Sequence, residues 1–296
     1  MNRTPAARSA SPQDAVRWKD LLVSAAGHQV PVRLFRPARP SGGWLVWAHG
    51  GSWQRGSPAQ WHEVTADLAR FSGSNVVSVA YRLAPEHSHP AALLDVLAAT
   101  GWARREAARE SGAAPVAVGG DSAGATLAAA AALVLRDAGQ PLAGQFLAYP
   151  PIDPACGARS YRADPDAFPS AEQMRAAWRA YRGSQPVRKL SGPNVLYSTP
   201  LEAQDVTGVA PAVLAVGDLD PVADDVRAYA HILRQAGVET SLRFFPRTPH
   251  AALLIPAPQG PDQPHPMRQW LGRMLAARFR TVKTTNPYTY PYQEDK

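Results

Sequence analysis

One serine, Ser122, lies between two glycines in the stretch Gly120-Asp121-Ser122-Ala123-Gly124. An apolar, strand-like run precedes the stretch and an alanine-rich run follows it, so the sequence predicts a sharp strand-to-helix turn at the serine. Such a turn strains the serine backbone and brings the residues two before and two after it into near contact, which favours glycine at both places. The serine hydroxyl then projects at the N-terminus of a helix, where free N–H groups stabilise developing negative charge. Ser122 is therefore the predicted nucleophile.

A serine nucleophile needs a base and a group that orients the base, and both are expected in loops that follow strands. His250 follows the strand-like run 241–245 and is the predicted general base. The orienting carboxylate is predicted to be Asp220, because the proline after it restricts its backbone to an extended conformation. Asp218 remains an alternative, whereas Asp224 and Asp225 precede a helix and are interpreted as charges at its N-terminus.

Backbone N–H groups that could stabilise an oxyanion are expected in the loop His49-Gly50-Gly51-Ser52-Trp53, which follows the apolar run 44–48. Successive glycines let a backbone approach a substrate oxygen with its N–H groups forward. The predicted donors are Gly50, Gly51 and Ser52, and the amide of Ala123 completes the set. His49 is expected to hold this loop by hydrogen bonds rather than to act as an acid or base.

Strand-like and helical runs alternate along the chain, which predicts one α/β domain over residues 1–296 with a mostly parallel central sheet and helices on both faces. The strand-like runs are 29–35, 44–48, 75–80, 116–119, 145–149, 212–216 and 241–245. The helical runs are 59–71, 91–110, 123–138, 222–236 and 264–279.

Residues 153–208 interrupt this alternation, since they contain a helical run at 170–181 but no strand-like run. An insert of this length after a core strand predicts a cap over the site. Trp53 and the cap residues Trp178 and Tyr181 are candidate substrate contacts, and ordinary packing of the helix onto the core is the alternative for the two cap residues. The segment 284–296 could form an edge strand, a dimer arm or a disordered tail, and the disordered tail is favoured.

The composition limits the classes of function. The formal net charge is +7, but arginine and lysine are scattered and form no run of the length that binds nucleic acid. This basic balance favours either anionic substrates or, more simply, a solvated surface. One cysteine excludes an intrachain disulfide, and the lack of an apolar stretch of 18 residues predicts a cytoplasmic protein that does not bind a membrane. No cluster of metal-ligand type and no phosphate-binding glycine loop is evident, so no metal is predicted.

Four stretches together resemble the hormone-sensitive-lipase-like branch of the α/β-hydrolases, the bacterial carboxylesterases. They are His49-Gly50-Gly51-Ser52-Trp53, Tyr81-Arg82-Leu83-Ala84-Pro85-Glu86, Gly120-Asp121-Ser122-Ala123-Gly124 and Asp220-Pro221-Val222 with Asp224-Asp225, and His250 stands where that family keeps its base. The resemblance implies an α/β-hydrolase fold with a small helical cap and hydrolysis of small esters with short or medium acyl chains through an acyl-enzyme, without a cofactor. It also implies that Gly51, Ser52 and Ala123 donate to the oxyanion, and it allows a homodimer.

The sequence departs from that family's pattern at two places. Ser52 stands where the third glycine is usual, and Ala251-Ala252 follow the histidine in place of Gly-Phe.

His-Gly-Gly-x-Trp also resembles arylformamidases, which cleave an N-formyl amide with the same groups, so such an amidase is an alternative. A biosynthetic lyase or cyclase with the same pocket is another. A ligand-binding relative without turnover, such as the plant gibberellin receptors, lacks the histidine, and His250 argues against that interpretation.

Overall fold

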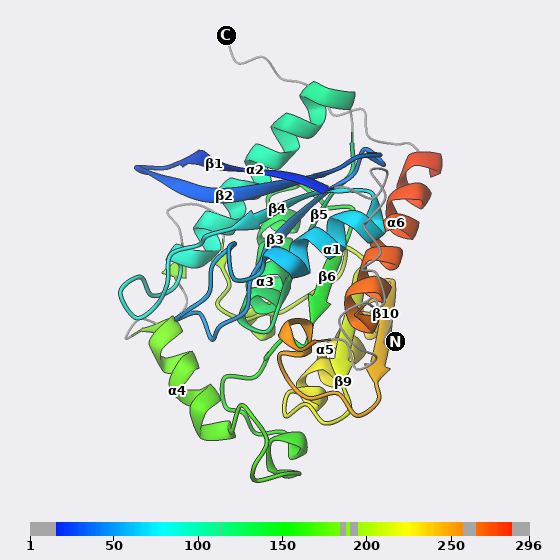
Figure 1. Ribbon diagram of the computed structural model, residues 1–296. Coiled ribbons are helices and arrows are strands. Elements are labelled where there is room, and N and C mark those ends of the chain that lie inside the picture. Colours follow the sequence, from blue (N-terminus) through cyan, green and yellow to red (C-terminus); the bar gives the residue numbers. More distant parts are fainter. Residues whose placement is uncertain (1–15, 113, 184–187, 190–194, 257–264, 286–296) are drawn as a thin grey trace, which may run out of the picture.

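The computed structural model describes residues 16–112, 114–183, 188–189, 195–256 and 265–285. An eight-stranded sheet in the order β1-β2-β4-β3-β5-β6-β9-β10 runs through the molecule (Figure 1). β1 pairs antiparallel with β2 and β2 with β4, while the pairs from β4 to β10 are parallel. The strands are β1 (Val16–Ala25), β2 (His28–Pro37), β3 (Trp44–Ala48), β4 (Asn75–Val79), β5 (Val116–Asp121), β6 (Gln145–Ala148), β9 (Ala212–Gly217) and β10 (Thr240–Phe245). The predicted α/β-hydrolase fold with a mostly parallel sheet is thus confirmed.

Helices cover both faces of the sheet, as the parallel strands require. Connections between parallel strands of one sheet are right-handed. The chain moves one way along the sheet from β3 to β4 and the opposite way from β4 to β5 and onward to β10. α1 therefore lies on one face of the sheet, and α2, α3 and α5 lie on the other. α6 packs against α1, and α2 packs against α3 (Figure 1). The helices are α1 (His62–Ser72), α2 (Ala91–Ser111), α3 (Ala123–Asp137), α5 (Ala223–Gln235) and α6 (Pro266–Thr285).

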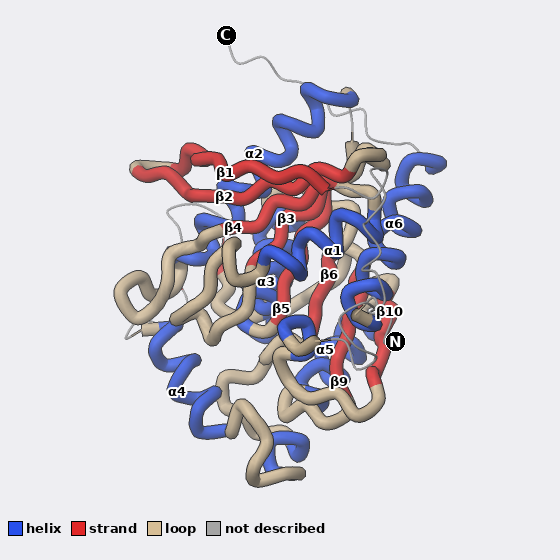
Figure 2. The backbone as a smooth tube through the Cα atoms, viewed as in Figure 1, coloured by secondary structure: helices blue, strands red, loops and turns tan. Residues whose placement is uncertain are grey.

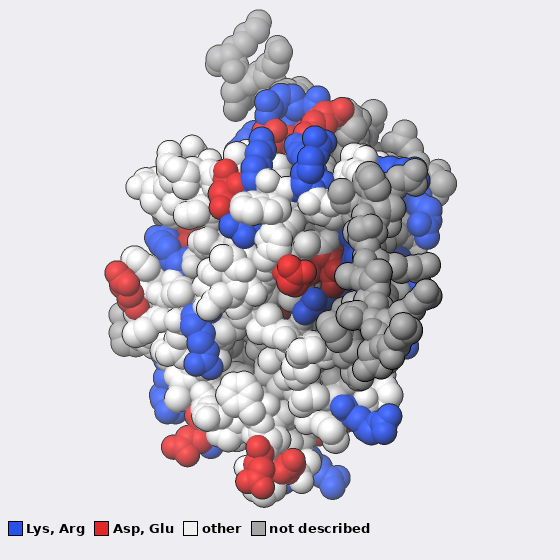
Figure 3. All heavy atoms as spheres, viewed as in Figure 1, with Lys and Arg blue, Asp and Glu red and all other residues white. Residues whose placement is uncertain are grey.

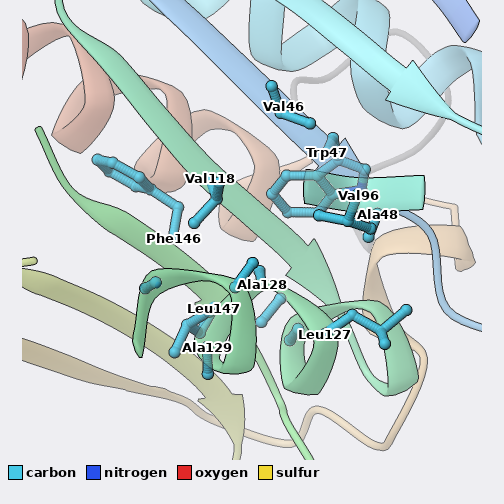
Figure 4. Packing of buried hydrophobic residues seen from close by; sticks show 14 of the residues in the cluster. Val46, Trp47, Ala48, Val96, Val118, Leu127, Ala128, Ala129, Phe146 and Leu147 are labelled. Carbon is cyan, nitrogen blue, oxygen red and sulfur yellow. The ribbon is translucent and has the colours of Figure 1, made fainter. Parts of the chain in front are cut away.

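α3 is buried from Ala123 to Leu135. Its alanines let the helix lie close to the sheet, and Figure 4 shows Ala128 and Ala129 beside Leu147 of β6. Gly119 has no room for a side chain, since an added Cβ would lie 2.8 Å from the carbonyl oxygen of Phe146 and 3.0 Å from the Trp47 ring. This close packing holds the carboxyl end of β5, where Ser122 follows, in a fixed place.

The segment between β6 and β9 contains α4 (Ala171–Arg182), the 3-10 turns η1 (Arg159–Arg162) and η2 (Pro200–Glu202), and the short antiparallel pair β7 (Arg188–Lys189) and β8 (Val195–Leu196). α4 agrees with the predicted helix and begins with a capping box in which Ser170 accepts from the Gln173 backbone and Gln173 accepts from the Ser170 backbone. Figure 2 shows the loops gathered beyond the carboxyl ends of β5, β6 and β9, where α4 also lies.

The structure differs from the predicted elements at three places. β1 was not predicted, because its side chains are mostly exposed, among them Trp18 and Leu22, and they give no apolar alternation to recognise. β7 and β8 lie where no strand was predicted. The proposed tail 284–296 begins inside α6, which extends to Thr285, and its remaining residues lie outside the described part of the chain.

Acidic and basic side chains are interspersed on the face of the molecule that Figure 3 shows. Within the described residues, no helix combines the length and the apolar character that crossing a bilayer requires.

Candidate active site

Ser122 stands between β5 and α3 with a φ of 49° and a ψ of −124°, a strained conformation for a residue with a side chain. The glycines on either side permit this turn. A Cβ on Gly120 would lie 2.4 Å from the carbonyl carbon of Gly124, and a Cβ on Gly124 would lie 2.0 Å from the carbonyl oxygen of Ala48. The close approach that the sequence predicted for these two glycines is therefore present.

The structure brings Ser122, His250 and Asp220 into one line of hydrogen bonds. Ser122 Oγ lies 2.9 Å from His250 Nε2, and His250 Nδ1 lies 2.9 Å from each carboxylate oxygen of Asp220. All three side chains are buried. A carboxylate next to Nδ1 favours the tautomer with the proton on that nitrogen, which leaves Nε2 free to accept the serine proton.

The loop that carries Asp220 explains why this carboxylate, rather than its neighbour, meets the histidine. The backbone N–H of Val222 donates to Asp220 Oδ1 at 2.9 Å and fixes the side chain. Asp218 turns away and accepts from the backbone N–H of Thr248 at 3.2 Å. The alternative that the sequence left open for Asp218 is thereby disfavoured.

The histidine loop is held by two groups that sequence reasoning did not identify. Tyr149, which follows β6, accepts a hydrogen bond from the Leu253 backbone N–H at 3.1 Å, and its ring meets the His250 ring edge-on at 5.0 Å. Arg268 of α6 donates from Nε to the Leu253 carbonyl at 2.8 Å. The backbone N–H and the carbonyl of Leu253, three residues after His250, are thus both bound. These bonds limit the movement of the His250 imidazole.

His49 supports the loop of residues 49–53, the glycine loop, as predicted. Its Nδ1 donates to the Gly50 carbonyl at 2.7 Å, and its ring stacks on Tyr81 with centroids 4.3 Å apart. Burial lowers the pKa of His49 to about 4, so the ring is neutral near pH 7 and Nδ1 carries the donor proton. Gly56 must lack a side chain, because a Cβ there would lie 2.3 Å from His49 Nδ1.

Asp121 anchors the same loop through a single oxygen. Its Oδ1 accepts from Trp61 Nε1 at 2.8 Å, from the Gly50 backbone N–H at 3.2 Å and from Trp47 Nε1 at 3.3 Å. Burial raises the pKa of Asp121 to about 7, although these three donors oppose the rise. The prediction of Gly50 as an oxyanion donor was wrong, because its N–H already binds this carboxyl group. The role of Asp121 was missed, and its only signal was its place in the serine motif.

Gly51 and Ser52 line a cavity of about 310 Å³ together with Ser122 and His250. Both have a positive φ, 111° at Gly51 and 56° at Ser52, and the Gly51 carbonyl accepts from two following backbone N–H groups. The other lining residues are Arg55, Gly56, Gln60, Trp61, Asp121, Phe168, Pro169, Ala251 and Leu254. Within the described residues, no group of three or more His, Cys, Asp or Glu side chains could hold a metal ion.

The three aromatic residues predicted to contact substrate lie elsewhere. Trp53, Trp178 and Tyr181 are fully buried, and none of them lines the cavity. The Trp53 ring stacks on Tyr181 with centroids 4.6 Å apart and lies 4.4 Å from the Trp178 ring. They form a buried cluster that joins α4 to the glycine loop, which agrees with the packing alternative for Trp178 and Tyr181.

The start of α5 joins the segment after β6 to the loop of Asp220. Asp225 was expected to act only as a charge at the helix N-terminus, but it is buried and its Oδ2 accepts from the backbone N–H groups of Ile152 and Asp153 at 2.9 and 3.1 Å. Its Oδ2 also accepts from the Tyr161 hydroxyl at 3.1 Å. Ser160 donates from Oγ to the carbonyl of Pro221, the residue after Asp220.

Comparison with known proteins identifies the family of the chain. A family model described as the alpha/beta hydrolase fold matches residues 45–254. The carboxylic ester hydrolase LipN of Mycobacterium tuberculosis is 35% identical over 254 residues, which cover 82% of this chain and 66% of that protein. An acetyl-hydrolase of Streptomyces hygroscopicus is 34% identical over 221 residues, 73% of this chain and 70% of that protein.

A solved structure gives the same result. The crystal structure of esterase LipW from Mycobacterium marinum matches with a TM-score of 0.77 and 33% identity, over 90% of this chain and 83% of that one. The chain therefore belongs to the hormone-sensitive-lipase-like branch of the α/β-hydrolase family.

Proposed function

We propose that this protein is a serine carboxylesterase in which Ser122, His250 and Asp220 form the catalytic triad. The observation that carries the proposal is the continuous line from Ser122 Oγ to His250 Nε2 and from His250 Nδ1 to Asp220, with 2.9 Å at each step. Its relatives are carboxylic ester hydrolases and an acetyl-hydrolase, so hydrolysis of a carboxylic ester is the reaction of its family.

In the first half of the reaction, Ser122 Oγ attacks the ester carbonyl while His250 Nε2 takes the hydroxyl proton. Asp220 orients the imidazole and stabilises its protonated form. His250 then gives the proton to the leaving alcohol, and an acyl-serine remains. In the second half, His250 takes a proton from water, the hydroxide attacks the acyl carbonyl, and Ser122 recovers its proton from His250.

The tetrahedral intermediates carry a negative oxygen that needs hydrogen-bond donors. The backbone N–H groups of Gly51, Ser52 and Ala123 are proposed for this role, the first two because they line the cavity beside Ser122 and the third because it begins α3. The first N–H groups of a helix have no partner within the helix. Loss of one such donor costs roughly 3–4 kcal/mol of transition-state stabilisation.

The size and lining of the cavity support small esters with short or medium acyl chains. It measures about 310 Å³, at the lower end of typical small-molecule sites, and Phe168 and Leu254 give it an apolar side. The segment 153–208 is proposed as the cap, because Phe168 and Pro169 from it line the cavity. The cytoplasmic location stays a prediction.

Replacement of the nucleophile tests the mechanism. Ser122→Ala is expected to lower kcat for a p-nitrophenyl acyl ester by at least about 10⁴-fold with an unchanged circular dichroism spectrum. Ser24→Ala, which changes an exposed serine of β1, is the matched control and should retain full turnover. An aryl phosphonate should add one covalent group, located at Ser122 by mass spectrometry.

Two outcomes would contradict the proposal. Full ester turnover by Ser122→Ala would show that another group performs the attack. Faster cleavage of an N-formyl aromatic amide than of the ester, with the same dependence on Ser122, would assign the protein to the amidase alternative instead.

A further inference from the structure

Arg55 stands at the junction of the active-site cavity and a second cavity. The second cavity measures about 390 Å³ and shares Ser52, Arg55, Phe168 and Pro169 with the first. Its remaining lining residues are Gln54, Gln173, Ala176 and Ala177. A substrate that is bound at Ser122 and extends beyond the first cavity would therefore pass the Arg55 side chain.

The backbone of Arg55 belongs to the same turn as two of the proposed oxyanion donors. The Arg55 N–H donates to the Gly51 carbonyl at 3.1 Å, and a Cβ on Gly51 would lie 2.0 Å from the Arg55 carbonyl oxygen. The turn is also supported from both sides, since Trp53 packs in the buried aromatic cluster and the Trp53 carbonyl accepts from the Ala84 N–H at 2.9 Å. The backbone of Arg55, from which the guanidinium extends, is thus held at a fixed place beside the proposed oxyanion donors.

Within the described part of the chain, no acidic side chain neutralises the charge of Arg55. The side chain is exposed, and among the residues that the structure describes it has no ion-pair or hydrogen-bond partner. The second cavity has no acidic residue in its lining. In the first cavity the acidic lining residue is Asp121, whose Oδ1 already accepts from three donors.

An unpaired guanidinium next to a substrate cavity attracts anions, and its planar fork matches the two oxygens of a carboxylate. The amide side chains of Gln54, Gln60 and Gln173 add neutral donors to the same walls. We propose that Arg55 makes this site select esters that carry a free carboxylate besides the ester group, an inference that rests on the proposed esterase function.

Two matched pairs of esters test the inference, because the carboxylate could lie on either side of the scissile bond. Phenyl acetate and 4-acetoxybenzoate differ by a carboxylate on the leaving group, and diethyl and monoethyl glutarate differ by a carboxylate on the acyl side. The quantity measured is the ratio of kcat/KM for the anionic ester to kcat/KM for its neutral partner. Intrinsic differences in ester reactivity cancel when this ratio is compared between variants.

For at least one pair, Arg55→Gln is expected to lower the ratio about fivefold, the size that one exposed ion pair of about 1 kcal/mol allows. Arg55→Lys should retain part of the selectivity, and Arg55→Glu should lower the ratio further. Arg105→Gln removes the same charge from an exposed position on α2 and should leave the ratio unchanged, which separates the local effect from that of net charge.

The unmodified protein provides a test that needs no substitution. Its ratio for the selected pair should fall as NaCl rises from about 0.02 to about 0.5 M, since salt screens exposed charges. Equal ratios in the unmodified protein and Arg55→Gln for both pairs, or a ratio that does not change with salt, would overturn the inference while turnover of the neutral esters still supports the esterase function. Failure to turn over any of the four esters would instead count against the proposed function itself.

Discussion

Replacement of Asp121 by asparagine should change how the stability of the protein depends on pH. The carboxyl group is buried, and burial raises its pKa from 3.8 to about 7 despite three N–H donors on Oδ1. The folded protein therefore binds a proton between pH 4 and pH 7 that the unfolded chain has already released. The ionised carboxylate is the less favourable form in the fold, so this group lowers the stability as the pH rises through that window.

The size of the effect follows from the shift. A rise of about 3 pKa units, at 1.36 kcal/mol each, corresponds to about 4 kcal/mol. The side-chain amide that Asp121→Asn introduces would keep an oxygen acceptor for the three donors and carry no charge. The difference in the free energy of unfolding, Asp121→Asn minus unmodified, should therefore increase by up to about 4 kcal/mol from pH 4 to pH 8 and then level off.

Urea unfolding followed by circular dichroism at half-unit steps from pH 4 to pH 8.5 measures this difference. Asp121→Ala serves as the comparison, because it removes the acceptor altogether and leaves buried donors unpaired, each at a cost of about 1–3 kcal/mol at every pH. A difference for Asp121→Asn that stays flat, or that falls as the pH rises, would refute the reasoning. A flat difference would mean that the three donors offset burial, and a falling one would mean that they outweigh it.

Further substitutions test other parts of the site. Asp220→Asn should lower kcat for a p-nitrophenyl ester by about 10³–10⁴-fold, because the imidazole loses the partner that sets its tautomer; a loss below tenfold would assign the orienting role elsewhere. Gly124→Ala places a Cβ 2.0 Å from the Ala48 carbonyl oxygen and should abolish activity and lower the melting temperature, whereas Gly101→Ala, within α2, should be neutral or stabilising by up to about 1 kcal/mol. Tyr149→Phe removes the acceptor for a buried backbone N–H near His250 and should cost about 1–3 kcal/mol in urea unfolding, and an unchanged midpoint would contradict this.

The meeting of Ser122, Asp220 and His250 could be predicted in part because the backbone around Ser122 and Asp220 leaves a local signal in the sequence. Two glycines flank Ser122 because their backbones approach within contact distance, and a proline follows Asp220 where the loop turns. The central strands were predictable for a similar reason. They are buried on both faces and therefore consist of short apolar runs.

The remaining parts depend on partners that are distant in the sequence. Gly50 fits the pattern of an oxyanion donor, but its N–H is bound by Asp121, which is 71 residues away. Aromatic residues at helical spacing, such as Trp178 and Tyr181, look the same whether they contact a substrate or pack against Trp53. The exposed strand β1 gave no apolar signal, and no local pattern shows that Arg55 lacks an ion-pair partner among the described residues.

The contacts between α5 and the segment after β6 set a limit on chimeras of this family. The Asp225 carboxylate holds the backbone of Ile152 and Asp153, and Ser160 binds the carbonyl next to the orienting acid. If the segment 153–208 is exchanged between relatives, a chain without a serine at the place of Ser160 loses the bond to the Pro221 carbonyl and disturbs the neighbouring Asp220. Recombination breakpoints placed after residue 225, or before residue 149, keep both partners from one parent and should preserve activity.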